Sequence, residues 1–126
     1  MKTLVCFRAG DGDFAVPVES TTGVRTPEGI TSLPGSRDDV VGVLPGEPPI
    51  TILSTLGEGR DHVLVLSVDG MCFGLLVQQV LGVLSVSDDD IGPAPAGQRE
   101  DYVAGTVRNV DNLILVADPR ALRGRL

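Results

Sequence analysis

The sequence predicts an all-β protein, and its composition supplies the first two observations that support this class. Gly occurs 16 times and Pro 9 times in 126 residues, so no uninterrupted helical pattern is longer than about ten residues. Aromatic residues make up only 3% of the chain, so Val, Leu and Ile must fill the core, and β-branched side chains suit pleated strands. The length is typical of one domain, and we expect residues 1–126 to form it.

The third observation is an internal repeat. The stretch from Phe73 to Val83 is similar to the stretch from Phe14 to Val24, at an offset of 59 residues (73 minus 14). A repeat of about sixty residues is too long for a solenoid unit, so it indicates a duplicated β-module, with chance similarity between apolar strands as the alternative. Further pairs follow in the same order at offsets of 61 to 63: Ile30 on Ile91, Pro34 on Pro95, Val41-Gly42 on Ala104-Gly105, and Ile50 to Leu53 on Leu113 to Val116.

In the first half, apolar and alternating runs between turn residues predict strands. The stretch from Ala9 to Gly12 has the residues of a hairpin turn. After Val24 the chain is rich in Pro, Gly and charge, so we expect a surface loop of which only Ile30 and Leu33 reach the core. The expected strands are Thr3–Arg8, Asp13–Val18, Val40–Leu44 and Ile50–Leu53, with the turn Pro45 to Pro49 between the last two.

The second half repeats this scheme with cleaner strands. Gly82 lies inside an apolar run and indicates a bulge or sharp bend. Asp118 followed by Pro119 predicts the start of a short C-terminal helical turn, with Asp118 as its N-cap. The expected strands are His62–Val68, Met71–Val77, Val80–Val86, Tyr102–Val107 and Leu113–Ala117, the last two joined by a turn from Asn109 to Asn112.

About ten short strands in two sets of five would form two small barrels side by side, because closure removes exposed strand edges. We expect the first barrel mainly within residues 13–60 and the second mainly within residues 61–117.

The charge of the chain excludes some classes of partner. A net charge of −7 and a pI near 4.4 argue against nucleic acid or an anionic membrane, which bind clustered cations. The one basic cluster, Arg120, Arg123 and Arg125, is expected to be a solvated helix end. No apolar run approaches the ~20 residues that span a bilayer, and no signal peptide is recognisable, so we expect no membrane insertion and a cytoplasmic protein.

Catalytic and metal-binding patterns are absent from the sequence. His62 is the only histidine, and neither a Gly-x-Ser-x-Gly motif nor a P-loop occurs. Cys6 and Cys72 lie in apolar runs and are expected to be reduced and buried. The run from Asp88 to Asp90 lacks the spacing of a calcium loop and is expected to be solvated. A small β-barrel enzyme or ligand-binding protein remains the alternative, and it would have an enclosed pocket lined by converging polar groups.

Eight landmarks follow one another along the chain: FAVPV, ITSLP, VVGVL, ITIL, VLVLSVDGMCFGLLVQQVLGVLSV, DIGPAP, YVAGTV and LILVADPRAL. Their order resembles the CheW-like family, the coupling domain of bacterial chemotaxis, over nearly the whole chain. The resemblance implies two intertwined five-stranded SH3-like β-barrels. It also implies an adaptor, without catalysis, cofactor or metal, that bridges the cytoplasmic tip of a chemoreceptor and the regulatory domain of a histidine kinase.

Two positions depart from the family pattern. Gly23 stands where the family usually has Glu, and the stretch from Gly42 to Gly46 is two residues shorter than usual and lacks its Arg. Arg25 could partly replace the missing charge. From the resemblance we expect partner contacts at Val24, Arg25, Val41, Leu44, Gly46 and Pro48, although the Val and Leu positions could instead be ordinary barrel core. Because we expect exposed grooves and no obvious edge strand, we expect a monomer outside complexes.

Overall fold

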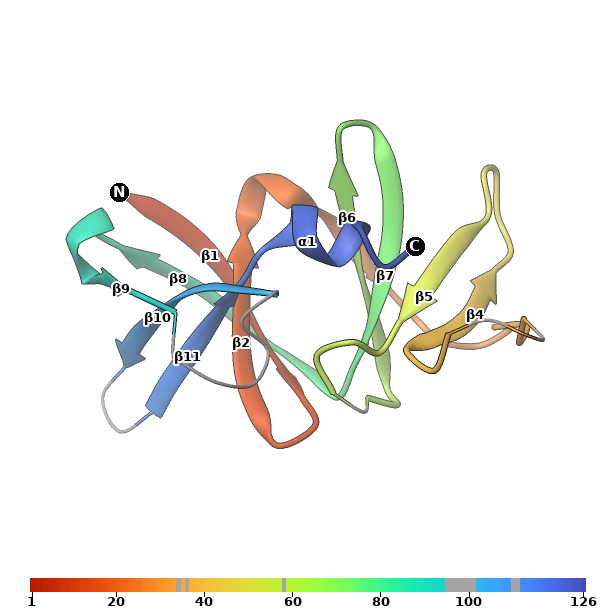
Figure 1. The fold of residues 1–126 in the computed structure, drawn as a ribbon, viewed down its shortest axis with the longest axis horizontal. Coiled ribbons are helices and arrows are strands. Elements are labelled where there is room, and N and C mark those ends of the chain that lie inside the picture. Colours follow the sequence, from red (N-terminus) through yellow and green to blue (C-terminus); the bar gives the residue numbers. More distant parts are fainter. Residues whose placement is uncertain (34, 36, 58, 95–101, 110–111) are drawn as a thin grey trace.

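The computed structural model describes residues 1–33, 35, 37–57, 59–94, 102–109 and 112–126. These residues form eleven strands, two short 3₁₀-helices and one α-helix (Figure 1), which confirms the all-β prediction. The strands are β1 (Lys2–Ala9), β2 (Gly12–Pro17), β3 (Thr21–Arg25), β4 (Val40–Leu44), β5 (Ile50–Leu53), β6 (His62–Val68), β7 (Met71–Val77), β8 (Gln79–Val86), β9 (Ile91–Gly92), β10 (Val103–Asn109) and β11 (Asn112–Ala117), and the helices are η1 (Val18–Ser20), η2 (Asp88–Asp90) and α1 (Pro119–Arg123).

The strands form two sheets that lie side by side in Figure 1. The six-stranded sheet has the order β8-β1-β2-β11-β10-β9, and the five-stranded sheet has the order β3-β6-β7-β5-β4. All nine strands listed from the sequence are present within about two residues of the expected bounds. Strands β3 and β9 were not among them.

Each sheet combines strands from both halves of the chain. The five-stranded sheet joins β3, β4 and β5 of the first half to the β6–β7 hairpin of the second half. The six-stranded sheet joins the β1–β2 hairpin of the first half to β8, β9, β10 and β11 of the second half. The parallel pairs β5–β7 and β2–β11 connect the exchanged hairpins to their sheets. The two halves are therefore intertwined.

This exchange changes the predicted division of the chain. A boundary near residue 60 was expected, with residues 13–60 in one barrel and 61–117 in the other. Strands of the five-stranded sheet instead run from Thr21 to Val77, and those of the six-stranded sheet occupy residues 2–17 and 79–117. The reason is that each leading hairpin finds its parallel neighbour in the other half of the chain.

Irregularities in the strand pairing repeat between the halves. The register of β3 against β6 shifts between Thr21 and Gly23, and the register of β1 against β8 shifts where Cys6 faces Gly82. The predicted bulge at Gly82 is confirmed, and its φ of +132° is one that residues with a Cβ rarely adopt. Gly23 faces Val65 as Gly82 faces Cys6, so the two bulges occupy equivalent places.

A second pair of glycines also supports the duplication. Gly42 and Gly105 follow equivalent register shifts in β4 and β10. A Cβ on Gly42 would lie 2.3 Å from the carbonyl oxygen of Thr31, and a Cβ on Gly105 would lie 2.7 Å from that of Gly92. Ile30 and Ile91, the residues before these carbonyls, take equivalent places, as predicted.

One predicted pairing is wrong by a single residue. Val40 faces Leu53 in the first half and Val103 faces Ala117 in the second, so Leu53 corresponds to Ala117 rather than to Val116. The connection before β11 therefore differs by one residue from that before β5. The predicted pair Pro34 and Pro95 lies outside the described residues.

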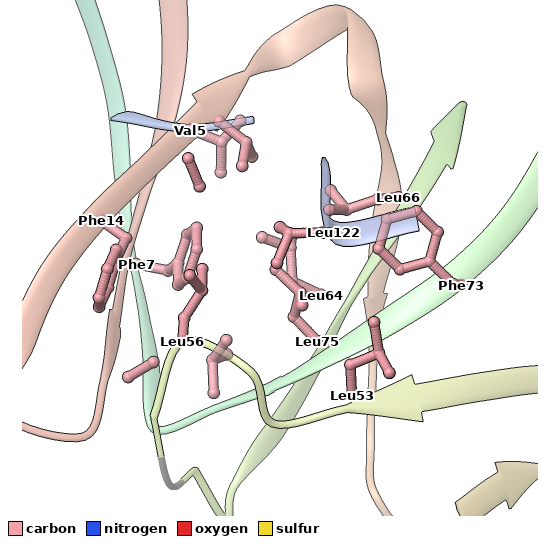
Figure 2. Packing of buried hydrophobic residues seen from close by; sticks show 14 of the residues in the cluster. Val5, Phe7, Phe14, Leu53, Leu56, Leu64, Leu66, Phe73, Leu75 and Leu122 are labelled. Atoms are coloured by element: carbon pink, nitrogen blue, oxygen red, sulfur yellow. The ribbon is translucent and has the colours of Figure 1, made fainter. Parts of the chain in front are cut away.

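The buried side chains form three clusters. The largest draws on both sheets and α1, and Figure 2 shows its side chains facing one another across the space between the sheets. In this inter-sheet cluster Phe7 and Phe14 stack with ring centroids 5.9 Å apart, and Leu122 of α1 is fully buried. Each of the other two clusters lies in one sheet. The cluster of the five-stranded sheet consists of Leu44, Ile52, Val63 and Val65, and we call it the small-sheet core.

The C-terminal helix begins as predicted. Asp118 accepts a hydrogen bond from the backbone N–H of Arg120 at 3.0 Å, and Pro119 occupies the first turn. Leu33 does not reach the core as expected, because its side chain is 42% exposed, whereas Ile30 packs against the small-sheet core. Among the described residues no helix has the length and apolar character needed to cross a membrane.

Candidate partner-binding groove

A hollow of about 460 Å³ lies in the five-stranded sheet, between its edge strand β3 and the turn that joins β4 to β5. The four successive residues from Thr22 to Arg25 line one wall. The turn from Gly46 to Pro48 forms the other wall, and Ile50, Val65 and Cys72 line the hollow from the strands between.

The lining of this hollow is largely apolar. Val24 is 50% exposed on one wall, and Pro48 stands on the other. Val65 is a buried member of the small-sheet core, so the bottom of the hollow reaches this core. Apolar side chains left exposed at a sheet edge are typical of a surface that a partner protein covers.

Arg25 supplies the positive charge of the hollow. A Cβ placed on Gly46 would lie 3.9 Å from Nη1 of Arg25, so the guanidinium reaches across to the turn. No carboxylate in the described part of the chain forms an ion pair with Arg25, although Glu47 also lines the hollow. The hollow therefore combines an apolar wall with a cation that has no acidic partner among the described residues.

A second hollow, of about 600 Å³, adjoins the first and shares Pro48 and Cys72 with it. Met71 and Leu126 line it with exposed fractions of 44% and 42%. We call the two hollows together the edge groove. Its far end is polar, because Asp69 lies there with Arg123 at 3.6 Å.

The structure brings four of the six predicted contact residues together. Val24 and Arg25 lie on the β3 wall of the first hollow, and Gly46 and Pro48 lie on the opposite wall. All four are exposed. β3 is one edge strand of the sheet and the turn follows β4, the strand at the other edge, so the hollow lies between the two edges of the sheet.

Leu44 and Val41 do not line the groove. Leu44 is 2% exposed and belongs to the small-sheet core, which corrects its prediction as a contact residue. The register shift between Val40 and Gly42 sets Gly42 and Leu44 as the buried positions of β4. Val41 is half-buried and packs against the small-sheet core.

Cys72 and Met71 were missed as surface residues. Cys72 was expected to be buried in a strand, but it is an exposed free thiol in the groove. The pairing of β5 with β7 begins at Phe73, so Met71 and Cys72 have no strand neighbour on that side. Cys6 is free and buried as expected, and burial, followed by the negative charge of Asp13, raises the pKa of its thiol.

A third hollow, of about 500 Å³, contains an ion pair and has a different chemistry. Arg125 Nε lies 2.8 Å from Oδ2 of Asp39, and the guanidinium carbon is 5.9 Å from the centre of the Tyr102 ring. The hydrogen bond from Arg125 is the main cause that lowers the pKa of Asp39, and the hydroxyl of Thr55 adds to it. This pairing joins the C-terminal segment to the loop before β4.

Metal-binding and catalytic arrangements find no support in the geometry. Within the residues that the structure places, no three His, Cys, Asp or Glu side chains gather into a group that could hold a metal ion. The side chains of Asp88, Asp89 and Asp90 are exposed, as expected, in a 3₁₀-helix capped by Ser87. The edge groove is lined mostly by apolar groups, unlike an enclosed pocket with converging polar groups.

Comparisons with known proteins agree with one another. A family model described as a CheW-like domain matches residues 44–125. The probable chemotaxis protein CheW of Rhizobium etli and the chemotaxis protein CheW of Rhizobium meliloti are each 33% identical over 104 residues, covering 75% of this chain and 67% of each relative. The crystal structure of scaffolding protein TtCheW from Thermoanaerobacter tengcongensis matches with a TM-score of 0.84 and 18% identity, over 94% of this chain and 84% of that one. At this identity the last comparison shows the fold alone.

Proposed function

This chain belongs to the CheW-like family, and from that membership we propose that it is a non-catalytic adaptor that couples chemoreceptors to a histidine kinase. The relatives named above are chemotaxis proteins, and the structural relative is named a scaffolding protein. The observation that carries the proposal is the edge groove, because it offers exposed apolar side chains beside an unpaired strand edge. Such a surface binds protein by shape and a few central contacts.

The proposed partners are the regulatory domain of a histidine kinase and the cytoplasmic tip of a chemoreceptor. Val24, Arg25, Gly46 and Pro48 are the proposed contacts, since they line one hollow. Val41 and the buried Leu44 support this surface from the side of the core, together with Val65. We propose a cytoplasmic protein that is a monomer outside its complexes and that has no nucleic-acid partner, in keeping with its net charge of −7.

An enzyme or small-ligand binder is the weaker candidate. It would require an enclosed pocket in which several polar groups converge. The edge groove is instead lined largely by apolar side chains, most of which are exposed. No observation in the described part of the chain favours this second candidate.

Isothermal titration of the protein against the regulatory domain of the kinase encoded beside it, and against the receptor's cytoplasmic hairpin, tests the proposed function. Wild-type protein is expected to bind at least one of them. The variant Val24→Asp is expected to bind the same partner about 30-fold more weakly, because it places a charge at the centre of an apolar contact. Circular dichroism should show an unchanged fold, since Val24 is 50% exposed.

The duplication supplies a matched control. Val83 stands 59 residues after Val24, in β8 at the edge of the other sheet, and is 66% exposed. Val83→Asp makes the same chemical change away from the groove, and it should alter the affinity less than about threefold. Wild-type protein that bound neither partner would contradict the proposed function. If the two variants lost affinity equally, the groove would not be the binding surface.

A further inference from the structure

We infer that the edge groove takes an extended segment of its partner that lies along β3 and sets a carboxylate against Arg25. This inference rests on the proposed function, because it specifies the chemistry of the surface that the adaptor would use. It concerns the first hollow, between β3 and the turn from Gly46 to Pro48.

The backbone of β3 favours an extended occupant. Among the residues that the structure describes, β3 is the outermost strand of its sheet and pairs on one side only, with β6. Its other edge therefore presents backbone N–H and C=O groups that a further strand can pair with. Four successive residues of this strand, from Thr22 to Arg25, line the hollow, so an occupant of the hollow lies beside β3.

The charge of the hollow selects an acidic residue. Arg8, Arg120, Arg123 and Arg125 each have a carboxylate oxygen within 2.8 to 3.6 Å. Arg25 has no such pair in the described part of this chain, although the net charge is −7. A partner that covers the hollow removes water from the guanidinium, and a carboxylate in the partner offsets that loss through a charge-assisted hydrogen bond.

The neighbours of Arg25 specify what flanks the acidic residue. Val24 and Arg25 point to opposite faces of β3, so a paired strand meets them with two adjacent residues. The residue opposite Arg25 is the acidic one, and the residue opposite Val24 is apolar, because Val24 is 50% exposed. The segment therefore carries an acidic and an apolar residue next to each other in an extended stretch.

Two synthetic peptides test this inference without a natural partner. One is a capped peptide of about ten residues with the central sequence Val-Glu-Val-Glu-Val, and its twin has Gln in place of each Glu. Titrated into isotopically labelled protein and followed by NMR, the acidic peptide should shift the β3 amides and the Nε–H of Arg25. It should bind at least tenfold more tightly than its twin, and Arg25→Gln should remove that difference. Equal binding of the two peptides, or no shift in β3, would overturn the inference.

A second titration separates this inference from the proposed function. Arg25→Glu should bind the kinase regulatory domain at least tenfold more weakly than wild type. Arg108→Glu makes the same charge change on the exposed end of β10 and should bind as wild type does. If wild type and Arg25→Glu bind equally, the inference is overturned and the adaptor role stands. If wild type binds no signalling partner while the acidic peptide still requires Arg25, the proposed function fails and the groove chemistry stands.

Discussion

Arg125 and Asp39, 86 residues apart in the chain, form a two-pronged ion pair. Nε of Arg125 donates to Oδ2 of Asp39 at 2.8 Å, and Nη2 donates to Oδ1 at 3.2 Å. The hydroxyl of Thr55 donates to the same carboxylate at 2.8 Å. These bonds hold the C-terminal segment, which follows the buried Leu122, against the loop that leads into β4.

We expect Arg125→Gln to lower the free energy of unfolding by about 1 kcal/mol at neutral pH, a modest value because the arginine is about a third exposed. The pKa of Asp39 is lowered in the folded protein, so the pair stabilises the fold above the unfolded carboxyl's pKa of about 3.9. This contribution disappears as the pH falls through the lowered pKa of the folded state. Urea unfolding at neutral and strongly acidic pH measures both effects.

Arg37 gives the control for this prediction. It lines the same hollow, but no ion pair to it occurs among the described residues, so Arg37→Gln should change stability by less than about 0.5 kcal/mol. A loss in Arg125→Gln that stays constant down to strongly acidic pH would show that the charge of Asp39 is not its cause.

Leu44 should behave as a core residue. It is 2% exposed within the small-sheet core, so Leu44→Ala should cost about 2–5 kcal/mol, and Leu44→Asp should prevent folding because it buries a charge. Circular dichroism and thermal unfolding measure this. Val24→Asp, also in the five-stranded sheet but exposed, should keep the wild-type spectrum. A folded Leu44→Asp variant with a wild-type melting temperature would contradict the buried position.

Gly42 and Gly105 should both resist substitution by Ala. The added Cβ would lie 2.3 Å and 2.7 Å from backbone carbonyl oxygens, so the strands would have to separate, at about 1–3 kcal/mol in each variant. Chemical denaturation measures the losses. Gly124→Ala, whose nearest contact is a more distant carbonyl at 3.2 Å, should change stability by no more than about 0.5 kcal/mol. Tolerance of Ala at both Gly42 and Gly105 would mean that the strands do not approach as closely as described.

The two thiols should differ strongly in reactivity. Cys72 is exposed, whereas Cys6 is buried and its pKa is raised by that burial, so a thiol reagent should modify Cys6 roughly 100-fold more slowly in the native protein. Time-resolved labelling with a chromogenic disulfide reagent gives the two rates. The fast phase should vanish in Cys72→Ser and should slow when the kinase regulatory domain occupies the groove. Equal rates for both thiols in the native state would contradict the burial of Cys6.

Patterns of apolar residues predicted nine strands, including the edge strands β4 and β8, but not the edge strands β3 and β9. β3 has only Val24 as a large apolar residue and is exposed along most of its length, so no alternation marks it in the sequence. Its identity as a strand comes from pairing with β6, 38 or more residues later, which local sequence does not encode. The position of β3 is also what brings Val24 and Arg25 opposite Gly46 and Pro48.

Burial along a strand depends on register, and one residue changes it. The bulge near Val41 decides that Leu44 points into the core, and the sequence of β4, VVGVL, is apolar at every position except Gly42. Cys72 was misplaced for a similar reason, because its exposure follows from where β5 begins to pair with β7. The sequence therefore predicted which segments border the groove better than it predicted which side chains in those segments are exposed.

The exchange of hairpins has a consequence for the ancestry and assembly of the chain. A single half of the sequence contains a hairpin that belongs to one sheet and three or four strands that belong to the other, so alone it would complete neither sheet. Two separate copies of such a half could complete both sheets by swapping hairpins, as a domain-swapped dimer does. Fusion of the copies into one polypeptide makes that dimer permanent, and its formation no longer depends on protein concentration. It also frees the two halves to diverge, so that Val24 and Arg25 border a groove on one sheet while Val83 and Leu84 occupy the corresponding strand of the other.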